Sequence, residues 1–320
     1  MKLFSLLILM LGMLSAPWAK AGTFPDRPVT IVVPYPPGGA VDAVTRKMAA
    51  ELQKQTGQAF IVQNKAGATG TIGILSVVHA PADGYTLVTN DTTYSLLPYI
   101  FKNLPFSPQS DLVPVAGFVF APMALAVKAS SKYKTLDDLL RAAKAAPGTM
   151  TYGTGGPGSL PDFATEGLGM AAHTRFLQVP FKGAGEATMA LLSGTIDFQM
   201  ASTPGLIGQV KADTVRLLAV SGDSQSSTLS QVPTFAQAGL PGFGVVNFTG
   251  MWAPKGTPPA VIARLESLIA QTMHSQAMRN YSGSMGAVPG YWSGPILGRN
   301  IAERTAYWGK VAANPSFEKR

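Results

Sequence analysis

The chain has 320 residues and a mass of 33.5 kDa, with 46% hydrophobic residues, 13% charged residues and a formal net charge of +8. This length suits one large domain or two ordinary ones. The lack of cysteine excludes disulfide scaffolds, thiol nucleophiles and thiolate zinc sites, and three scattered histidines leave few metal-binding or general-base options. The positive charge is spread without a Lys/Arg run, which favours attraction of small anions over binding of nucleic acid.

The N-terminus is predicted to be a secretory signal peptide, residues 1–21. Lys2 precedes an apolar run at 3–14, and Ala-Lys-Ala at 19–21 is a small-x-small cleavage pattern. The alternative is an uncleaved membrane anchor, but this run is shorter than the roughly 20 residues that span a bilayer. We therefore expect cleavage after the second alanine and export of the mature protein.

Strands and glycine-rich loops alternate with helices in the first part of the mature chain. The β-branched run 29–33 predicts a buried strand, and the apolar spacing over 41–52 predicts a helix. A second strand at 60–63 leads through another glycine-rich loop into a helix, and an Asp-Gly turn starts a third strand at 85–89. This alternation is typical of a parallel α/β sheet.

The same pattern restarts further along the chain. Helices are predicted at 135–145, at 159–172 and after Gly185, and a mainly helical section begins near 245. Two α/β units and a helical tail predict two lobes with a cleft, where ligands bind at the carboxyl ends of the strands. The strands predicted in this part are 123–127, 150–153, 176–179, 196–200 and 215–220.

Two neighbouring loops are candidate anion sites. The loop 37–40 joins the first strand to the first helix, so helix N–H groups without partners and the positive end of the helix dipole face the space beyond it. The loop 67–70 repeats this arrangement. One such loop is more often a plain tight turn that binds nothing. Two neighbouring loops of this kind favour a carboxylate or phosphate pocket as much as they favour two plain turns. Neither loop has a P-loop or dinucleotide motif, which argues against a phosphate cofactor.

Polar residues near these loops have structural and functional interpretations. If Gly39 is an N-cap, Asp42 lies in the first helical turn, where it stabilises the helix or pairs with a ligand ammonium. Ser159 and Asp162 fit a capping box, which gives Asp162 a structural role. No G-x-S-x-G or H-E-x-x-H motif occurs, so we expect no catalytic residues, metal or cofactor. The histidines are predicted as surface or helix C-cap residues: His79, His173 and His274.

Short motifs follow one another in order through essentially the whole mature chain. They are RPVTIVVPYPPGGAVD at 27–42, NKAGATG at 64–70, DGYTL at 83–87, YGTG at 152–155, VPFKG at 179–183, SGTID at 193–197, RLLAV at 216–220, VPT at 232–234 and WAP at 252–254. Any one of them is weak evidence. As an ordered set they closely resemble the tripartite tricarboxylate transporter receptors, also called the Bug family of periplasmic solute-binding proteins.

The resemblance implies an α/β, two-lobed periplasmic-binding-protein (type II, Venus flytrap) fold with a cleft between the lobes. Residues 22–122 form the first part of lobe 1, 123–246 form lobe 2, and 247–320 form the return segment and C-terminal helices of lobe 1. Similar receptors hold a carboxylate through backbone amides and bridging waters of the lobe 1 loops. The ligand-binding residues so implied are Gly38, Gly39, Ala40, Asp42, Gly67, Ala68 and Gly70 in lobe 1, and Thr154, Ser159, Phe181, Lys182, Gly183, Ala184 and Asp197 in lobe 2.

The chain departs from the family pattern at two positions. The family commonly has His where this chain has Asp162 and Gln178. An acid at the first position either changes which ligand is accepted or only improves the helix cap.

The function we expect is that of a periplasmic, monomeric receptor for a mono- or dicarboxylate, an amino acid or an aromatic acid. It would deliver this ligand to membrane permease subunits, without covalent chemistry and without nucleic acid as a partner. One alternative is a receptor that presents its ligand to a signalling partner. The other is an exported enzyme that uses Asp42, Asp162 or Asp197 as an acid or base.

Overall fold

The computed structural model describes residues 24–313, apart from 155, 157, 182, 223–228 and 242. The signal peptide expected at 1–21 and the predicted site residue Lys182 lie outside the described residues. Within these described ranges, no helix is both long enough and apolar enough to cross a membrane.

Three parallel strands form one end of the sheet. They are β1 (Val29–Val33), β2 (Phe60–Asn64) and β3 (Thr86–Asp91), in the spatial order β2-β1-β3. The helices α2 (Ala40–Thr56) and α3 (Thr71–Val78) provide the crossovers that parallel strands need. All three strands were predicted to within two residues at either end, because short runs rich in β-branched and apolar residues give a clear signal even where, as in β2, one face is exposed.

A second set of parallel strands repeats this arrangement at the other end. The strands β5 (Thr151–Thr154), β6 (Leu177–Pro180) and β7 (Phe198–Ser202) lie in the order β7-β5-β6. Their crossovers are α6 (Leu160–Ala172) and α7 (Ala184–Ser193). Each end of the sheet is therefore a parallel α/β unit of the predicted kind.

Long antiparallel strands join the two units. The strand β4 (Leu112–Lys128) pairs with β9 (Val246–Pro254) as far as Pro122, and with β7 and β8 (Val215–Val220) from Met123 onward. β9 also pairs with β3, and β10 (Val288–Ser293) with the first half of β4. The division into lobes at residues 122 and 246 stays a prediction, which the change of partner within β4 supports.

The sequence predicted only the second half of β4. Pro114, Gly117 and Pro122 interrupt the apolar pattern of the first half, and such residues are depleted in central strands. The structure accommodates the strand through two register shifts, one between Pro114 and Ala116 and one between Phe118 and Phe120, and at the second of them Val119 adopts a left-handed φ of 49°. The sheet is consequently mixed, with antiparallel strands at its centre.

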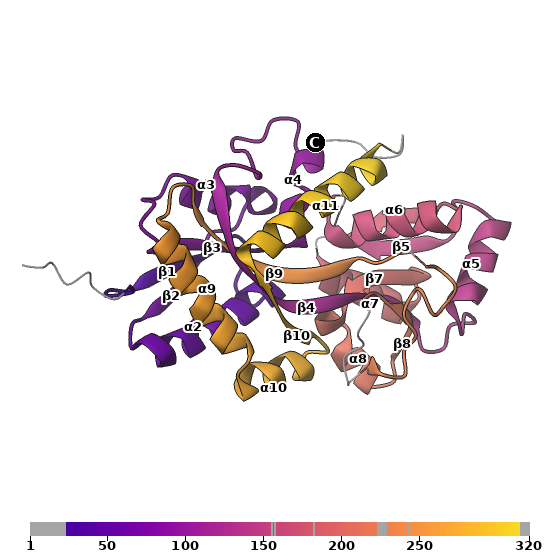
Figure 1. Cartoon of the computed structure of the whole chain (residues 1–320). Coiled ribbons are helices and arrows are strands. Elements are labelled where there is room, and N and C mark those ends of the chain that lie inside the picture. The colour runs from indigo at the N-terminus through magenta and orange to yellow at the C-terminus, as the bar shows by residue number, and fades with distance from the viewer. Residues whose placement is uncertain are drawn as a thin grey trace, which may run out of the picture.

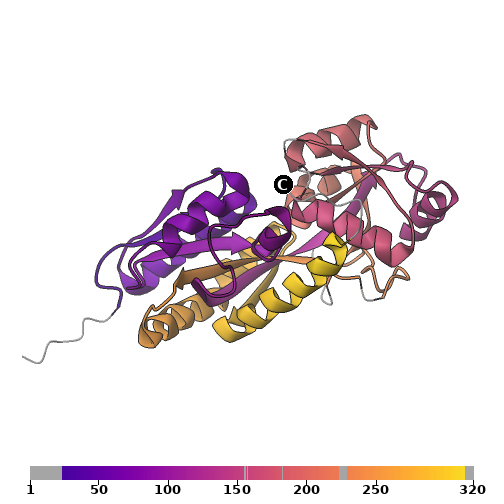
Figure 2. The ribbon, with the colours of Figure 1, turned by 90° about the horizontal axis from the view of Figure 1, so that it is seen from above.

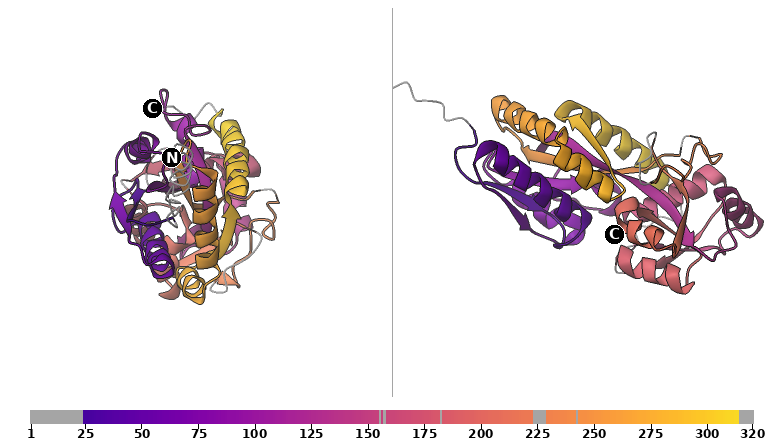
Figure 3. Two further views of the ribbon diagram at one scale, coloured as in Figure 1. Left: turned by 60° about the vertical axis from the view of Figure 1, so that its left-hand side comes forward. Right: turned by 90° about the horizontal axis from the view of Figure 1, so that it is seen from below.

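The views in Figures 1, 2 and 3 show how the elements are arranged. β4 and β9 run between two bodies, with β1 to β3 in one and β5 to β8 in the other, and α9 and α10 cover the first body. The remaining α-helices are α4 (Leu97–Ile100), α5 (Leu136–Ala145), α8 (Ile207–Lys211), α9 (Pro259–Met273), α10 (Gln276–Ser284) and α11 (Gly294–Ala312), and the short 3-10 helices are η1 (Ala68–Gly70), η2 (Thr92–Ser95) and η3 (Thr203–Gly205).

The helix α11 packs against both bodies. Leu297 and Ile301 belong to the core under β3 and β9, whereas Trp308 and Val311 are buried with α6 of the second body. The rings of Trp308 and Phe163 meet edge to face with centroids 5.6 Å apart. The sequence assigned the C-terminal helices to lobe 1 alone. A helix of 19 residues is roughly 28 Å long, so α11 reaches across the junction.

Candidate ligand cavity

A cavity of about 320 Å³ lies where strand ends and helix starts of both bodies meet. Its size suits a small organic molecule. The residues that line it are Tyr35, Gly39, Ala40, Val41, Thr69, Asp91 and Thr93 of the first body, Met123, Ser159, Leu160, Pro161 and Ser202 of the second, and Asn247 of β9.

The helices α2 and α6 begin at this cavity with almost the same backbone geometry. Their N-caps are Gly39 (φ −73°, ψ 168°) and Ser159 (φ −74°, ψ 158°). Gly38 and Gly158 precede them with left-handed φ values of 85° and 79°, which glycine adopts without strain. Neither N-cap residue makes a side-chain cap hydrogen bond, and the first-turn residues of both helices line the cavity, so the first N–H groups of α2, and those of α6 apart from Pro161, are left for a ligand. Two positive dipole ends therefore face one small space.

The carboxylate of Asp42 holds the loop in front of α2. It is 3% exposed, and its Oδ2 accepts the backbone N–H of Gly38 at 2.9 Å. Asn64 donates to Oδ1 at 2.9 Å, and Arg46 forms an ion pair with the same carboxylate at 3.0 Å. Burial raises the pKa of Asp42, but the hydrogen bonds from Arg46, Gly38 and Asn64 outweigh it and leave the pKa below its usual value. Asp42 thus lies behind the loop and outside the cavity lining.

The carboxylate of Asp162 likewise holds the loop in front of α6. The capping box predicted for Ser159 and Asp162 is nevertheless wrong. Ser159 makes no side-chain cap hydrogen bond; instead, Oδ2 of Asp162 accepts the N–H of Gly158 at 2.8 Å. Oδ1 accepts the Tyr152 hydroxyl at 2.9 Å and the Gln178 amide at 2.5 Å. Burial, followed by the charges of nearby acids, raises the pKa of Tyr152, which keeps this hydroxyl a donor.

The sequence carries a signal for this repeated arrangement. Pro-Gly-[Gly/Ser]-x-x-Asp occurs at 37–42 and again at 157–162. The two departures from the family pattern, Asp162 and Gln178, are hydrogen-bonded to each other. They therefore alter the support behind the α6 loop, and neither side chain lines the cavity.

A polar cluster at the end of β3 forms another part of the wall. Oδ1 of Asp91 accepts the Tyr35 hydroxyl and the N–H of Thr93, both at 3.0 Å, and the amide of Asn247 lies 3.5 Å from Oδ2. Tyr35 also lies 2.7 Å from Oδ1 of Asn90. Burial and the charge of Asp91 raise the pKa of Tyr35, so its hydroxyl remains protonated. Asp91 thus brings a carboxylate to the cavity.

The structure brings part of the predicted site together. Gly39, Ala40 and Ser159 line the cavity, as does Thr69 from the predicted loop 67–70. Thr69 and Ala68 have left-handed φ values of 52° and 44°, a strained conformation for residues with a Cβ. Four further predicted residues flank these lining positions within the same loops: Gly38, Gly67, Ala68 and Gly70.

Several predicted residues of the second body do not line the cavity. Thr154 is buried at the end of β5, where its hydroxyl meets Gly156 and Gln178. Asp197 accepts the N–H and hydroxyl of Thr151, each at 2.8 Å, at the opposite ends of β5 and β7 from the cavity. The others not found in the lining are Phe181, Gly183 and Ala184 at the start of α7.

Sequence reasoning missed several lining residues. Asp91 and Thr93 belong to the polar run 90–93 directly after a predicted strand, a position that should have indicated a ligand site. Ser202, the last residue of β7, follows the predicted strand 196–200 in the same way. Asn247 gave no signal, because it reaches the cavity only through the pairing of β9 with β4.

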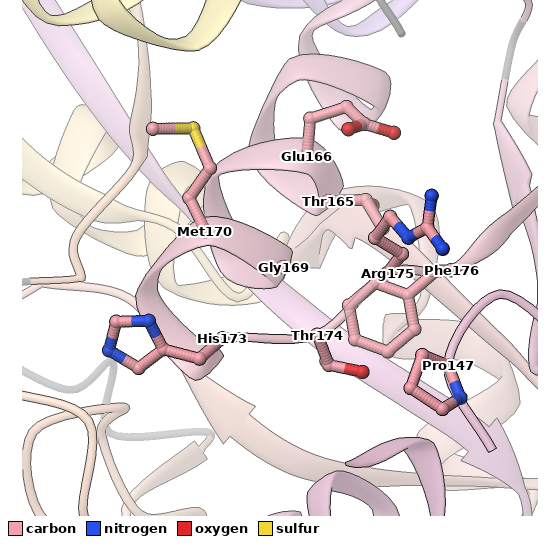
Figure 4. Close-up of a pocket in the computed structure, with 9 residues that line it drawn as sticks. All are labelled: Pro147, Thr165, Glu166, Gly169, Met170, His173, Thr174, Arg175 and Phe176. Carbon is pink, nitrogen blue, oxygen red and sulfur yellow. The ribbon is translucent and has the colours of Figure 1, made fainter. Parts of the chain in front are cut away.

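A second hollow of about 340 Å³ lies near the C-terminal end of α6. Figure 4 shows Glu166 and Met170 projecting from this helix and His173 just beyond it. The residues around it are Pro147, Thr165, Glu166, Gly169, Met170, His173, Thr174, Arg175 and Phe176. The hollow begins at Thr165, one helical turn beyond Pro161 of the ligand cavity, and the two cavities share no lining residue.

All three histidines cap helix C-termini, as predicted. His79 ends α3, His173 ends α6 and His274 ends α9. Within the ranges that the structure describes, no group of three or more His, Asp or Glu side chains is placed to hold a metal ion.

The two α/β lobes, with helix starts of both facing one cavity, define the class of periplasmic binding proteins. The sequence matches the family described as tripartite tricarboxylate transporter family receptor over residues 44–315.

BugT of Bordetella pertussis is 33% identical, over 84% of this chain and 83% of BugT. MatC of Rhodopseudomonas palustris with bound malate has a TM-score of 0.77 and 28% identity, over 90% of this chain and 100% of MatC. A further R. palustris protein with adipate has a TM-score of 0.81 and 30% identity, over 90% and 97% of the two chains. The chain therefore belongs to the tripartite tricarboxylate transporter receptor family, the Bug family.

Replacing Asp42 tests how the first loop is held. Asp42→Asn removes the charge that pairs with Arg46, and we expect it to lower the free energy of unfolding at pH 7 by about 1–3 kcal/mol. Because the pKa of Asp42 is lowered in the folded state, this contribution is present above the ordinary carboxyl pKa of about 3.9 and is lost below it. Urea unfolding of both proteins between pH 7 and pH 2.5 measures the difference. Asp137→Asn, at an exposed ion pair, is the control and should change little; a constant Asp42 effect down to pH 2.5 would exclude a role for the charge.

Proposed function

We propose that this protein is a periplasmic solute-binding receptor that captures a small dicarboxylate between its lobes and delivers it unchanged to a membrane permease. The observation that carries the proposal is the convergence of the uncapped N-termini of α2 and α6 on one cavity. A carboxylate at each helix start would interact favourably with both dipoles. Malate and adipate, bound by two similar proteins, are dicarboxylates of suitable size.

Backbone N–H groups would make the main contacts with the ligand. Among the described residues that line the cavity, Asp91 carries the only charged side chain, so attraction for an anion has to come from the helix starts. Closure of the lobes would remove water and strengthen these hydrogen bonds.

The hydroxyl of Ser159 would add a side-chain contact. Its Oγ is buried and has no hydrogen-bond partner among the described residues, although Ser159 lines the cavity. A buried polar atom without a partner costs free energy, and a ligand oxygen would remove that cost.

The carboxylate of Asp91 would select among organic acids. It repels a second carboxylate placed beside it, but accepts a hydrogen bond from a ligand hydroxyl or ammonium group. This favours hydroxy- or amino-substituted dicarboxylates over plain ones. Simple monocarboxylates and aromatic acids leave one helix start unused.

The same proposal includes the transport role, a cleaved signal peptide and a monomeric receptor. The family name supports a permease partner. A receptor for a signalling protein would use the same cavity. The family and its structural neighbours are binding proteins, which supports a function without catalysis.

Calorimetric titration of the mature protein with malate, aspartate, succinate, adipate and acetate tests the ligand class. We expect binding of the four-carbon dicarboxylates, with malate or aspartate bound more tightly than succinate. If none of these acids binds, the proposed function is wrong.

Two variants of Gly39 test the backbone contacts. Gly39→Pro removes one N–H at a φ of −73° that proline adopts, whereas Gly39→Ala keeps the N–H and adds a Cβ that only meets the Pro36 carbonyl oxygen at 3.7 Å. We expect the proline variant to weaken malate binding by about tenfold or more, and the alanine variant far less. Thermal unfolding checks that both variants fold. Equal losses in the two variants would count against a contact through this N–H.

Removing the Ser159 hydroxyl separates ligand binding from stability. Ser159→Ala should leave the melting temperature of the free protein unchanged or slightly higher, because the Oγ has no partner, and should weaken malate binding by about fivefold. Ser282→Ala is the matched control, since that Oγ is also buried without a partner but lies in α10. Unchanged malate affinity in Ser159→Ala would eliminate the proposed contact.

Neutralising Asp91 tests selectivity. In Asp91→Asn the amide oxygen still accepts from Thr93, but the negative charge is gone. We expect adipate to bind about threefold to tenfold more tightly, and the preference for malate over succinate to shrink. Dissociation constants of the three acids, measured for both proteins, provide the comparison. If the preference for malate over succinate stays the same, Asp91 does not contribute to ligand selectivity.

A further inference from the structure

A second cavity lies on the other face of the strands that join the lobes. It measures about 360 Å³, and we call it the rear cavity. Pro122 and Val246 line it, whereas the next residues along the same strands, Met123 and Asn247, line the ligand cavity. Successive side chains of a strand point to opposite faces, so the two cavities lie back to back across β4 and β9. The other residues that line the rear cavity are Phe120, Ser221, Gly222, Val288, Trp292 and Arg304.

Aromatic rings form one wall of the rear cavity. The ring centroids of Phe120 and Trp292 are 4.3 Å apart with the planes tilted by 46°, and Phe248 lies 5.2 Å from Trp292. The Phe120 ring lies directly against the backbone of Gly290, where a Cβ would come within 1.9 Å of it. Pro122, Val246 and Val288 make the rest of the lining mainly apolar, which suits a flat hydrocarbon ring.

Arg304 brings a positive charge to this apolar space. Its guanidinium carbon lies 5.7 Å from the Phe248 ring centroid and 5.9 Å from that of Trp292. The Nε atom is buried and has no hydrogen-bond partner within the part of the chain that the structure describes. Burial lowers the pKa of Arg304, an effect that the charge of Glu303 partly offsets. A guanidinium N–H that is shielded from water and lacks an acceptor is unfavourable, and an anion in the cavity would supply that acceptor.

We propose that the rear cavity is a second ligand site that binds a small aromatic carboxylate. The carboxylate accepts hydrogen bonds from the Arg304 guanidinium, and the aromatic ring packs against Phe120 and Trp292. The volume lies in the range of small-molecule sites. The site is separate from the one between the helix starts, and its occupancy does not depend on which acid the ligand cavity takes.

Titration with benzoate, and with benzamide as its neutral analogue, tests the proposal. By calorimetry on the mature protein, we expect benzoate to bind at least about tenfold more tightly than benzamide. Arg304→Gln should weaken benzoate binding by about tenfold or more, because the charge-assisted hydrogen bonds are lost. Lys310→Gln is the matched control: it removes the same charge from an exposed position on α11 and should leave benzoate binding unchanged.

A second variant keeps the test valid if Arg304→Gln does not fold. Val288→Phe retains Arg304 and narrows the cavity, so it should also weaken benzoate binding, with circular dichroism to check its fold. In Gly39→Pro, where the ligand cavity is altered, benzoate binding should persist. The proposal is overturned if benzoate does not bind, or if Gly39→Pro abolishes binding while Arg304→Gln and Val288→Phe leave it unchanged. Both results differ from a failure of the proposed function, which concerns malate and related acids.

Discussion

The ligand cavity depends on one interaction that occurs twice: a buried aspartate in the first turn of a helix accepts the N–H of a glycine four residues earlier. Asp42 does this for Gly38 and Asp162 for Gly158. Because the carboxylate holds the preceding loop, the helix start needs no side-chain cap, and its first N–H groups remain available to a ligand. The buried carboxylates thus orient the backbone of both loops, and in the proposed function backbone N–H groups, rather than a cationic side chain, contact the anion.

The crossing strands determine where the two helix starts meet. β4 pairs with β9 as far as Pro122 and with strands of the second lobe from Met123 onward. β9 leads the chain back to the first lobe beside β4. The second register shift of β4 and the left-handed Val119 coincide a few residues before Pro122, so backbone strain lies close to where the lobes join. The two faces of these strands carry different chemistry, with polar helix starts on one and aromatic rings beside Arg304 on the other.

Much of the fold could be predicted from local patterns. β1, β2 and β3 and the helices α2 and α3 were predicted because periodicity and glycine-rich loops are properties of short segments. The first half of β4 was missed because its prolines and glycine are tolerated only through bulges and pairing with β9. β10 was also missed, because its residues are half-buried throughout and give no alternation. The capping box at Ser159 was wrong because Asp162 accepts the N–H of Gly158 together with side chains from β5 and β6, Tyr152 and Gln178.

The sequence by itself determined the α/β class and the glycine-rich loop at 37–40 that reaches the cavity, since each depends on residues close together in the chain, and it determined the family through the order of short motifs along the whole mature chain. Only the tertiary structure decided which side chains complete the site. Asp91, Ser202 and Asn247 come from three strands and meet because strand pairing brings their ends together. Asp197, in contrast, is placed at the far ends of its strands, because a parallel strand exposes its first and last residues at opposite edges of the sheet.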